Sequence, residues 1–201
     1  MDRKPVSVKS YANIAIVKYW GKADAERMIP STSSISLTLE NMYTETKLSF
    51  LPEDATGDVM YIDDELQGEK ETIKASKVLD LFRTNPNQHV KIETWNNMPT
   101  AAGLSSSSSG LSALVKAANE LFQVGKTQSE LAQIAKFASG SSSRSFFGPL
   151  AAWDKDSGEV YPVETDLKLA MIMLVLTDQK KPVSSRDGMK LCTETSTSFP
   201  E

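Results

Sequence analysis

The stretch that decides the fold is residues 96–110, which read Asn96-Asn97-Met98-Pro99-Thr100-Ala101-Ala102-Gly103-Leu104-Ser105-Ser106-Ser107-Ser108-Ser109-Gly110. Just before it, Val90, Ile92 and Thr94 alternate with Lys91 and Glu93, which is the period of a half-buried strand. Just after it, apolar residues recur at helical spacing, at Leu111, Leu114, Val115, Ala118 and Phe122. The serine run therefore lies at a turn from a strand into a helix.

This turn has the chemistry of a phosphate cradle. Pro99 and Gly103 shape the backbone, small residues let it approach a ligand closely, and a helix N-terminus offers unpaired N–H groups to an anion. A flexible serine linker is the plain alternative, but Pro-Thr-Ala-Ala-Gly-Leu is not a linker composition. No Gly-Lys-Ser/Thr follows, so the turn is not a P-loop, and no Gly-x-Ser-x-Gly elbow predicts a hydrolase.

The remaining periodicities predict an α+β order of elements. We expect strands in residues 5–17, 32–40, 43–51 and 59–62, a hairpin from 149–153 to 159–163, and a buried central strand in 169–176. We expect helices in residues 69–82 and 131–137, and a last helix that begins after residue 189. Thr127 and Glu130 form a capping box ahead of the second of these helices.

Three further stretches concentrate cations and hydroxyls. Residues 18–22 are Lys-Tyr-Trp-Gly-Lys, residues 139–145 are Ser-Gly-Ser-Ser-Ser-Arg-Ser, and residues 180–186 contain two lysines, two serines and an arginine. Lysine suits phosphate, and an arginine fork holds a carboxylate bidentately. On composition alone, 18–22 could also be an exposed turn, 139–145 a helix C-terminal loop and 180–186 a solvated basic loop. A fourth stretch, the acidic residues 63–65, predicts a solvated turn rather than a metal site.

Composition narrows the class of protein and of partner. The chain has 201 residues and a net charge of −4, which gives no basic field for nucleic acid. Its one cysteine, Cys192, allows no internal disulfide and fits a reducing compartment, so we expect a cytoplasmic protein. No secretory h-region and no membrane-spanning apolar run occur. Neither Cys192 nor the single His89 has partners at a spacing that predicts catalysis or metal binding.

The quoted stretch resembles the nucleotide loop of the GHMP kinase superfamily, and within it the mevalonate diphosphate decarboxylases. Ala-Ala-Gly-Leu followed by serines matches the decarboxylase loop except at Ser105, where that family carries alanine. Residues 12–15 with 18–22, Ala-Asn-Ile-Ala and Lys-Tyr-Trp-Gly-Lys, match its N-terminal signature. Residues 138–145 match its Ala-Ser-Gly-Ser-Ala-Cys-Arg-Ser segment except at Ser142 and Ser143.

The resemblance implies a set of site residues. Those that would bind substrate are Lys18, Tyr19, Lys22, Ser139, Ser141, Arg144, Ser185 and Arg186, with Arg144 and Ser185 as the catalytic candidates. Those that would bind ATP are Pro99, Ala101, Ala102, Gly103, Leu104, Ser105, Ser106, Ser107 and Ser108. Mg²⁺ would arrive with ATP, with Ser106 as the one candidate protein contact, and either Lys180 or Lys181 would reach the ATP phosphates.

The resemblance also implies a fold and a reaction. The fold would be the α+β GHMP kinase N-terminal domain, of the ribosomal protein S5 domain 2 type, over residues 1–183, with 184–201 beginning a C-terminal domain. The reaction would be ATP- and Mg²⁺-dependent decarboxylation of (R)-5-diphosphomevalonate to isopentenyl diphosphate, by an enzyme that is a homodimer at full length. Because the family aspartate proposed as base lies beyond Glu201, we expect these 201 residues to be an N-terminal portion that lacks turnover. A mevalonate or phosphomevalonate kinase, or a non-catalytic nucleotide-binding module, is the alternative.

Overall fold

The computed structural model describes residues 4–24, 26–98, 106–172, 183 and 185–198. The predicted strand–loop–helix unit is present: β7 (Val90–Asn96) precedes the loop and α2 (Ser106–Leu121) follows it. Residues 99–105 of the loop lie outside the described residues. The strand and helix on either side of the serine run are thus confirmed.

One mixed sheet forms the centre of the molecule, with the strand order β6-β5-β7-β4-β8-β9 and β1 paired to β4. Strand β4 (Ser34–Phe50) organises it. Along one edge β4 pairs with β1 (Val6–Val17), and its other edge is shared by β7 and β8 (Leu150–Trp153). The sheet is completed by β5 (Val59–Ile62), β6 (Glu65–Leu66) and β9 (Val160–Val163). Only the β5–β7 pairing among the described strands is parallel.

Two strand predictions need correction. The segments expected as separate strands, 32–40 and 43–51, are one continuous strand, because residues 40–42 are accommodated by a register shift opposite Tyr11 and Ala12. Of the predicted buried strand 169–176, residues 169–172 are in no strand, and Ile172 is 86% exposed. A run of apolar residues forms a β-strand only where an adjacent strand is available for backbone hydrogen bonds. Residues 173–176 lie outside the described part of the chain.

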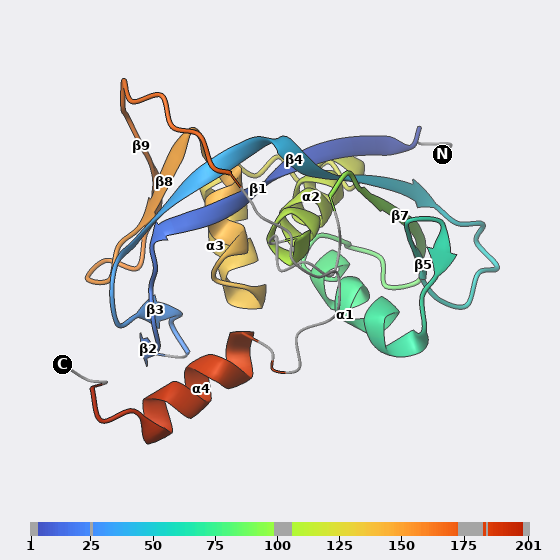
Figure 1. Cartoon of the computed structure of the whole chain (residues 1–201). Helices are drawn as coiled ribbons and strands as arrows, with labels where there is room; N and C mark the ends of the chain where they lie inside the picture. The colour runs from blue at the N-terminus through green and yellow to red at the C-terminus, as the bar shows by residue number, and fades with distance from the viewer. Residues whose placement is uncertain (1–3, 25, 99–105, 173–182, 184, 199–201) are drawn as a thin grey trace.

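Helices cover one face of the sheet (Figure 1). Helix α2 packs on β1 and β4, with α1 (Glu69–Leu79) and α3 (Gln128–Ala138) beside it. The core lies between them and includes Leu48, Leu79, Val90, Ile92, Val115, Ala118 and Ala132. The capping box begins α3, since Thr127 Oγ1 accepts from Glu130 N and the Glu130 carboxylate accepts from Thr127 N.

The shorter elements complete the chain. A 3₁₀ helix, η1 (Ser142–Phe146), follows α3, and a small two-stranded sheet joins β2 (Lys22–Asp24) to β3 (Ile29–Pro30). Helix α4 (Ser185–Thr195) begins earlier than the last predicted helix, which was expected to start after residue 189. None of the described helices is long and apolar enough to cross a membrane. The predicted domain boundary at 183/184 borders residues outside the description and stays a prediction.

Candidate active site

The first predicted cluster, residues 18–22, follows β1 directly. Gly21 has φ of 78°, a left-handed conformation that favours glycine, and it turns the chain into β2. Trp20 N donates to Thr32 Oγ1 over 3.0 Å, which ties the turn to the chain ahead of β4. Lys18 and Lys22 are exposed, whereas Tyr19 is half-buried. The turn therefore presents two cations to solvent and directs its phenol inward.

The second cluster begins where α3 ends. Ser139 is the C-cap of α3, and its hydroxyl lies 3.2 Å from that of Ser141. Asn13, buried on β1, donates from Nδ2 to Ser141 O over 3.0 Å and to Ser145 Oγ over 2.8 Å. Strand β1 thus fixes both ends of the segment that carries the predicted serines. The 3₁₀ conformation of η1 could not be read from the serine run.

Arg144 is the central side chain of this segment. It is 2% exposed, and its Nε and Nη1 donate to Ser36 Oγ at 2.5 Å and Ser34 Oγ at 3.0 Å, two hydroxyls on β4. Among the described residues no carboxylate lies within ion-pair distance of Arg144. Burial lowers the pKa of its guanidinium to about 10, with Tyr19 acting in the opposite sense, so Arg144 is still a cation at neutral pH.

An aromatic wall encloses this guanidinium. Its carbon Cζ lies 5.6 Å from the ring centroid of Tyr19 and 5.8 Å from that of Trp153, and the two rings meet edge to face at 4.7 Å. Gly140 lies against the same indole, because a Cβ placed there would be 2.7 Å from Trp153 Cη2 and Cζ3. Tyr19 thus joins Gly140, Arg144 and Trp153, from a distant stretch of the sequence, in one compact pocket.

The predicted ATP loop is anchored at its strand end. Asp63 and Asp64, both with positive φ, make the tight β5–β6 turn, and Asp63 Oδ1 accepts from Asn96 N at 2.8 Å. Asp64 Oδ1 accepts from Trp95 Nε1 at 3.0 Å, and Asn97 Oδ1 accepts from Tyr43 N at 2.7 Å. The acidic pair was predicted to be a solvated turn. The turn is confirmed, but its carboxylates hold the end of β7.

Only part of the predicted ATP set falls within the described residues. Pro99, Ala101, Ala102, Gly103, Leu104 and Ser105 lie outside it, and of Ser106 the backbone alone is described, as the start of α2. Ser107 is exposed, while Ser108 is fully buried. Ser185 and Arg186 are described only as backbone of α4, and Lys180 and Lys181 lie outside the description.

The fold brings the elements that carry the predicted ATP-binding and substrate-binding residues into contact. Helix α2, which follows the ATP loop, packs against both β1 and η1, the elements that carry or precede Tyr19, Ser141 and Arg144. A groove of about 800 Å³ between α1 and the β5–β6 region is lined by none of the predicted site residues. Among the described residues no group of three His, Cys, Asp or Glu could hold a metal ion.

Sequence reasoning missed the residues that surround Arg144. Ser34 and Ser36 are more than 100 positions away from it. The local sequence of β4 does not distinguish a serine that accepts a hydrogen bond from an arginine from any other buried serine of a strand. Trp153 was predicted only as part of a hairpin. The buried Asn13 belongs to a matched motif, but its hydrogen bonds needed the fold.

The α+β arrangement, with helices on one face of a mixed sheet and the β7–loop–α2 unit, is the GHMP kinase type of fold. The pattern of the diphosphomevalonate decarboxylase-like N-terminal domain family matches residues 10–161, and the chain belongs to this family.

Known relatives agree with this placement. The structure of mevalonate pyrophosphate decarboxylase from Streptococcus pyogenes is 67% identical, with a TM-score of 0.92, and the match covers 99% of this chain and 63% of that one. MDDEF in complex with MVAPP, AMPPCP and magnesium is 37% identical, with a TM-score of 0.79 and coverage of 96% and 62%. The diphosphomevalonate decarboxylase of Saccharomyces cerevisiae is 36% identical over 97% of this chain. This chain spans 55% of that yeast relative.

Proposed function

We propose that this chain forms the ATP- and substrate-binding part of an enzyme that decarboxylates (R)-5-diphosphomevalonate to isopentenyl diphosphate. The observation that carries the proposal is Arg144, a buried cation held by two hydroxyls and two aromatic rings with no described carboxylate beside it. Burying a charge is costly unless a partner compensates, so this arrangement favours an anionic ligand. A relative bound to MVAPP and AMPPCP supports a substrate of this class.

The reaction needs an electron sink. The substrate has no carbonyl β to its carboxylate, so ATP first transfers its γ-phosphoryl group to the 3-hydroxyl. Phosphate then leaves C3 with the C–O electron pair, and the electrons of the bond to the carboxylate form the alkene as carbon dioxide departs. The protein's part is to align two polyphosphates and one carboxylate and to stabilise charge.

The residues divide this work by their chemistry. Arg144 would fix the carboxylate and so orient the bond that breaks, while Tyr19, Lys18 and Lys22 would hold the substrate diphosphate. Ser139 and Ser141 would supply hydroxyls beside them, and Ser185 and Arg186 complete the predicted substrate set. Residues 99–108 would cradle the ATP phosphates at the N-terminus of α2, where exposed Ser107 is the described hydroxyl best placed to reach them.

Magnesium would accompany ATP. The described residues offer no carboxylate cluster for a resident ion, so the donor set suits a metal carried by the nucleotide with Ser106 as its candidate hydroxyl contact. Bound there, Mg²⁺ would neutralise charge on the transferring phosphoryl group. A further domain after residue 183, a homodimer at full length and a cytoplasmic location stay predictions.

The test is a product analysis on the full-length enzyme and on this chain. With diphosphomevalonate and Mg-ATP, we expect isopentenyl diphosphate, carbon dioxide, ADP and phosphate in equal amounts from the full-length protein. The alternative kinase would instead consume mevalonate or its monophosphate and release no carbon dioxide. For the 201-residue chain, calorimetry should detect diphosphomevalonate binding without turnover. Absence of carbon dioxide from the full-length enzyme would overturn the proposal.

A further inference from the structure

A lysine outside every predicted site lies half-buried between α2 and η1. Lys116, on α2, has Nζ 3.2 Å from Ser10 Oγ, 3.3 Å from Ser145 O and 4.9 Å from the ring centroid of Phe146. No carboxylate forms an ion pair with it among the described residues. Burial lowers the pKa of its ammonium to about 8. A cation with only neutral oxygens and a ring around it is costly to bury, which calls for a functional reason.

The number of hydrogen-bond donors on each group constrains which atoms donate and which accept around Lys116. An ammonium only donates, whereas each serine hydroxyl has a single hydrogen to donate. Ser112 Oγ lies within donating distance of Ser108 O at 2.9 Å and Ser109 O at 3.0 Å, and Ser10 Oγ lies 2.7 Å from Ser112 Oγ. One consistent assignment is a chain in which Lys116 donates to Ser10, Ser10 donates to Ser112, and Ser112 donates to the first turn of α2. In the other, Ser112 donates to Ser10, and Ser10 donates to Ser145 O, which lies 3.3 Å away. In both, the Lys116 ammonium donates to Ser10.

The same ammonium reaches the other half of the site. Its second acceptor, Ser145 O, belongs to the residue that follows Arg144 in η1. Helix α2 is held firmly by its apolar side, where Ala113, Val115, Ala117 and Ala118 are fully buried. Segment η1 has only five residues: Phe146 packs into the core, and Ser145 is tethered by Asn13 and Lys116. Loss of a tether should therefore displace η1 rather than α2.

Another lysine, Lys136, is more deeply buried and provides a contrast. Lys136, on α3, donates from Nζ to Gly158 O over 2.8 Å, in the turn between β8 and β9, and burial lowers its pKa as well. It is 5% exposed and joins a helix to a hairpin turn that carries no predicted site residue. Lys116 and Lys136 are thus alike in chemistry and differ in what they hold.

We propose that Lys116 is a positioning residue, whose ammonium keeps η1, and with it Arg144, in register with the first turn of α2. The inference rests on the proposed function, since it assigns Lys116 to the alignment of the substrate carboxylate with the ATP phosphates. It predicts a specific kinetic signature, because substrate contacts on η1 should suffer while nucleotide contacts on α2 should not.

The experiment compares Lys116→Met, Lys116→Arg and the control Lys136→Met in the full-length enzyme. For Lys116→Met we expect the KM for diphosphomevalonate to rise on the order of tenfold, because small displacements of a positioning group are costly, with the KM for ATP within about twofold. Lys116→Arg keeps the donors and should recover most of the loss. Lys136→Met should leave both KM values unchanged. Thermal melting should show Lys116→Met no less stable than the native enzyme, since the buried cation is gone.

Each outcome has one meaning. Native enzyme without decarboxylation would refute the proposed function itself. Active native enzyme with a Lys116→Met variant whose substrate KM is unchanged, or whose two KM values rise together, would overturn the positioning role. Should Lys116→Met melt below the native enzyme, Ser10→Ala carries the same test, because it breaks the hydroxyl chain and keeps the cation; an unchanged substrate KM there would equally refute the role.

Discussion

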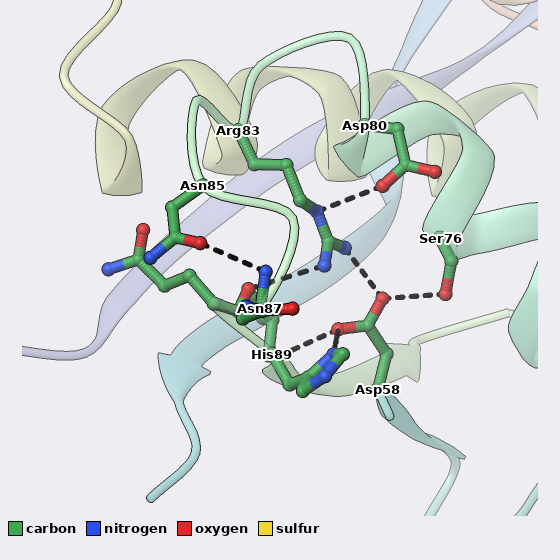
Figure 2. A network of polar contacts seen from close by, with 9 residues as sticks. Asp58, Ser76, Asp80, Arg83, Asn85, Asn87 and His89 are labelled. Atoms are coloured by element: carbon green, nitrogen blue, oxygen red, sulfur yellow. Dashed lines mark hydrogen bonds and ion pairs between the residues drawn. The ribbon is translucent and has the colours of Figure 1, made fainter. Parts of the chain in front are cut away.

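Two buried arginines show how this fold uses the same side chain for opposite purposes. Arg83, just past the end of α1, is 5% exposed and lies 2.6 Å from Asp58 Oδ2, whose own side chain is 3% exposed (Figure 2). Its Nε lies 3.0 Å from Asp80 Oδ1, and its Nη1 donates to Gln88 O. Arg144 is as deeply buried, yet its hydrogen bonds go to two serine hydroxyls. One guanidinium is matched by carboxylates within the chain, and the other, for which we propose an anionic ligand, has no carboxylate partner among the described residues.

Asp58 shows what a completed network requires. Its two oxygens accept from Arg83 Nη2, Ser76 Oγ and Val90 N, and His89 Nδ1 lies 3.7 Å away. Figure 2 shows Asp58 near Ser76 of α1, Arg83 from the chain after α1 and His89 just before β7. Serine, aspartate and histidine meet here, but Ser76 bonds to Asp58 and not to His89, so the arrangement has no activated nucleophile. The network joins α1 to the sheet.

The largest expected effect is on stability at the completed pair. Asp58→Asn leaves Arg83 buried without its closest anion and should lower the free energy of unfolding by about 3–5 kcal/mol. Denaturant unfolding of this chain measures it. The control is Glu71→Gln, which breaks the exposed 2.8 Å pair with Lys74 and should change stability by under about 0.5 kcal/mol. Equal effects of the two substitutions would show that the buried network contributes nothing special.

Arg144 should show the reverse pattern. Arg144→Gln removes the charge that we propose binds the substrate carboxylate. Turnover of the full-length enzyme should therefore fall by about 100-fold or more while ATP binding is retained. Stability should not fall as it does for Asp58→Asn, because no buried carboxylate is left unpaired. Isopentenyl diphosphate formation and a parallel denaturant titration measure the two quantities. Near-normal turnover would show that Arg144 does not act in the reaction, and the functional difference proposed between the two arginines would then be wrong.

A smaller effect should come from the wall that holds Arg144. In Gly140→Ala the new Cβ would lie 2.7 Å from two atoms of the fully buried Trp153, so the indole must shift, at a cost of about 1–3 kcal/mol. Because Trp153 packs on both Tyr19 and Arg144, the affinity for diphosphomevalonate should weaken about tenfold in calorimetry. Gly68→Ala is the control, since a Cβ there meets nothing within 4 Å. If both variants bind alike, the indole does not support the pocket.

The same contrast separates what could be predicted from the sequence from what could not. The β7–loop–α2 unit, the α3 capping box and the β8–β9 hairpin carry local signals, a period or a cap within a few residues, and were predicted. The single long β4 was not predicted, because Glu40 and Asn41 interrupt the alternation as a turn would, and only the register with β1 shows that the strand continues. The partners of Arg144 and Arg83 were missed because they are chosen by tertiary contact, at separations of 108 and 25 positions for Ser36 and Asp58.

The smallest expected effect is the change in stability at acid pH, and it distinguishes the environment of Arg83 from that of Arg144. Burial raises the pKa of Asp58, but hydrogen bonds from Arg83, Ser76 and Val90 N outweigh it and leave the pKa below its ordinary value of 3.8. As pH falls through about 4, the unfolded chain takes up this proton before the folded one does, so stability present above that pH is progressively lost. The stability gap between the native chain and Asp58→Asn should therefore narrow from pH 5 to the lowest pH at which the chain folds. The gap for Arg144→Gln should stay constant over the same range, because no titrating carboxylate faces that guanidinium among the described residues. Urea titrations at stepwise lower pH measure both gaps, and a gap that narrows equally for the two variants would mean that Arg144 has an acidic partner of its own.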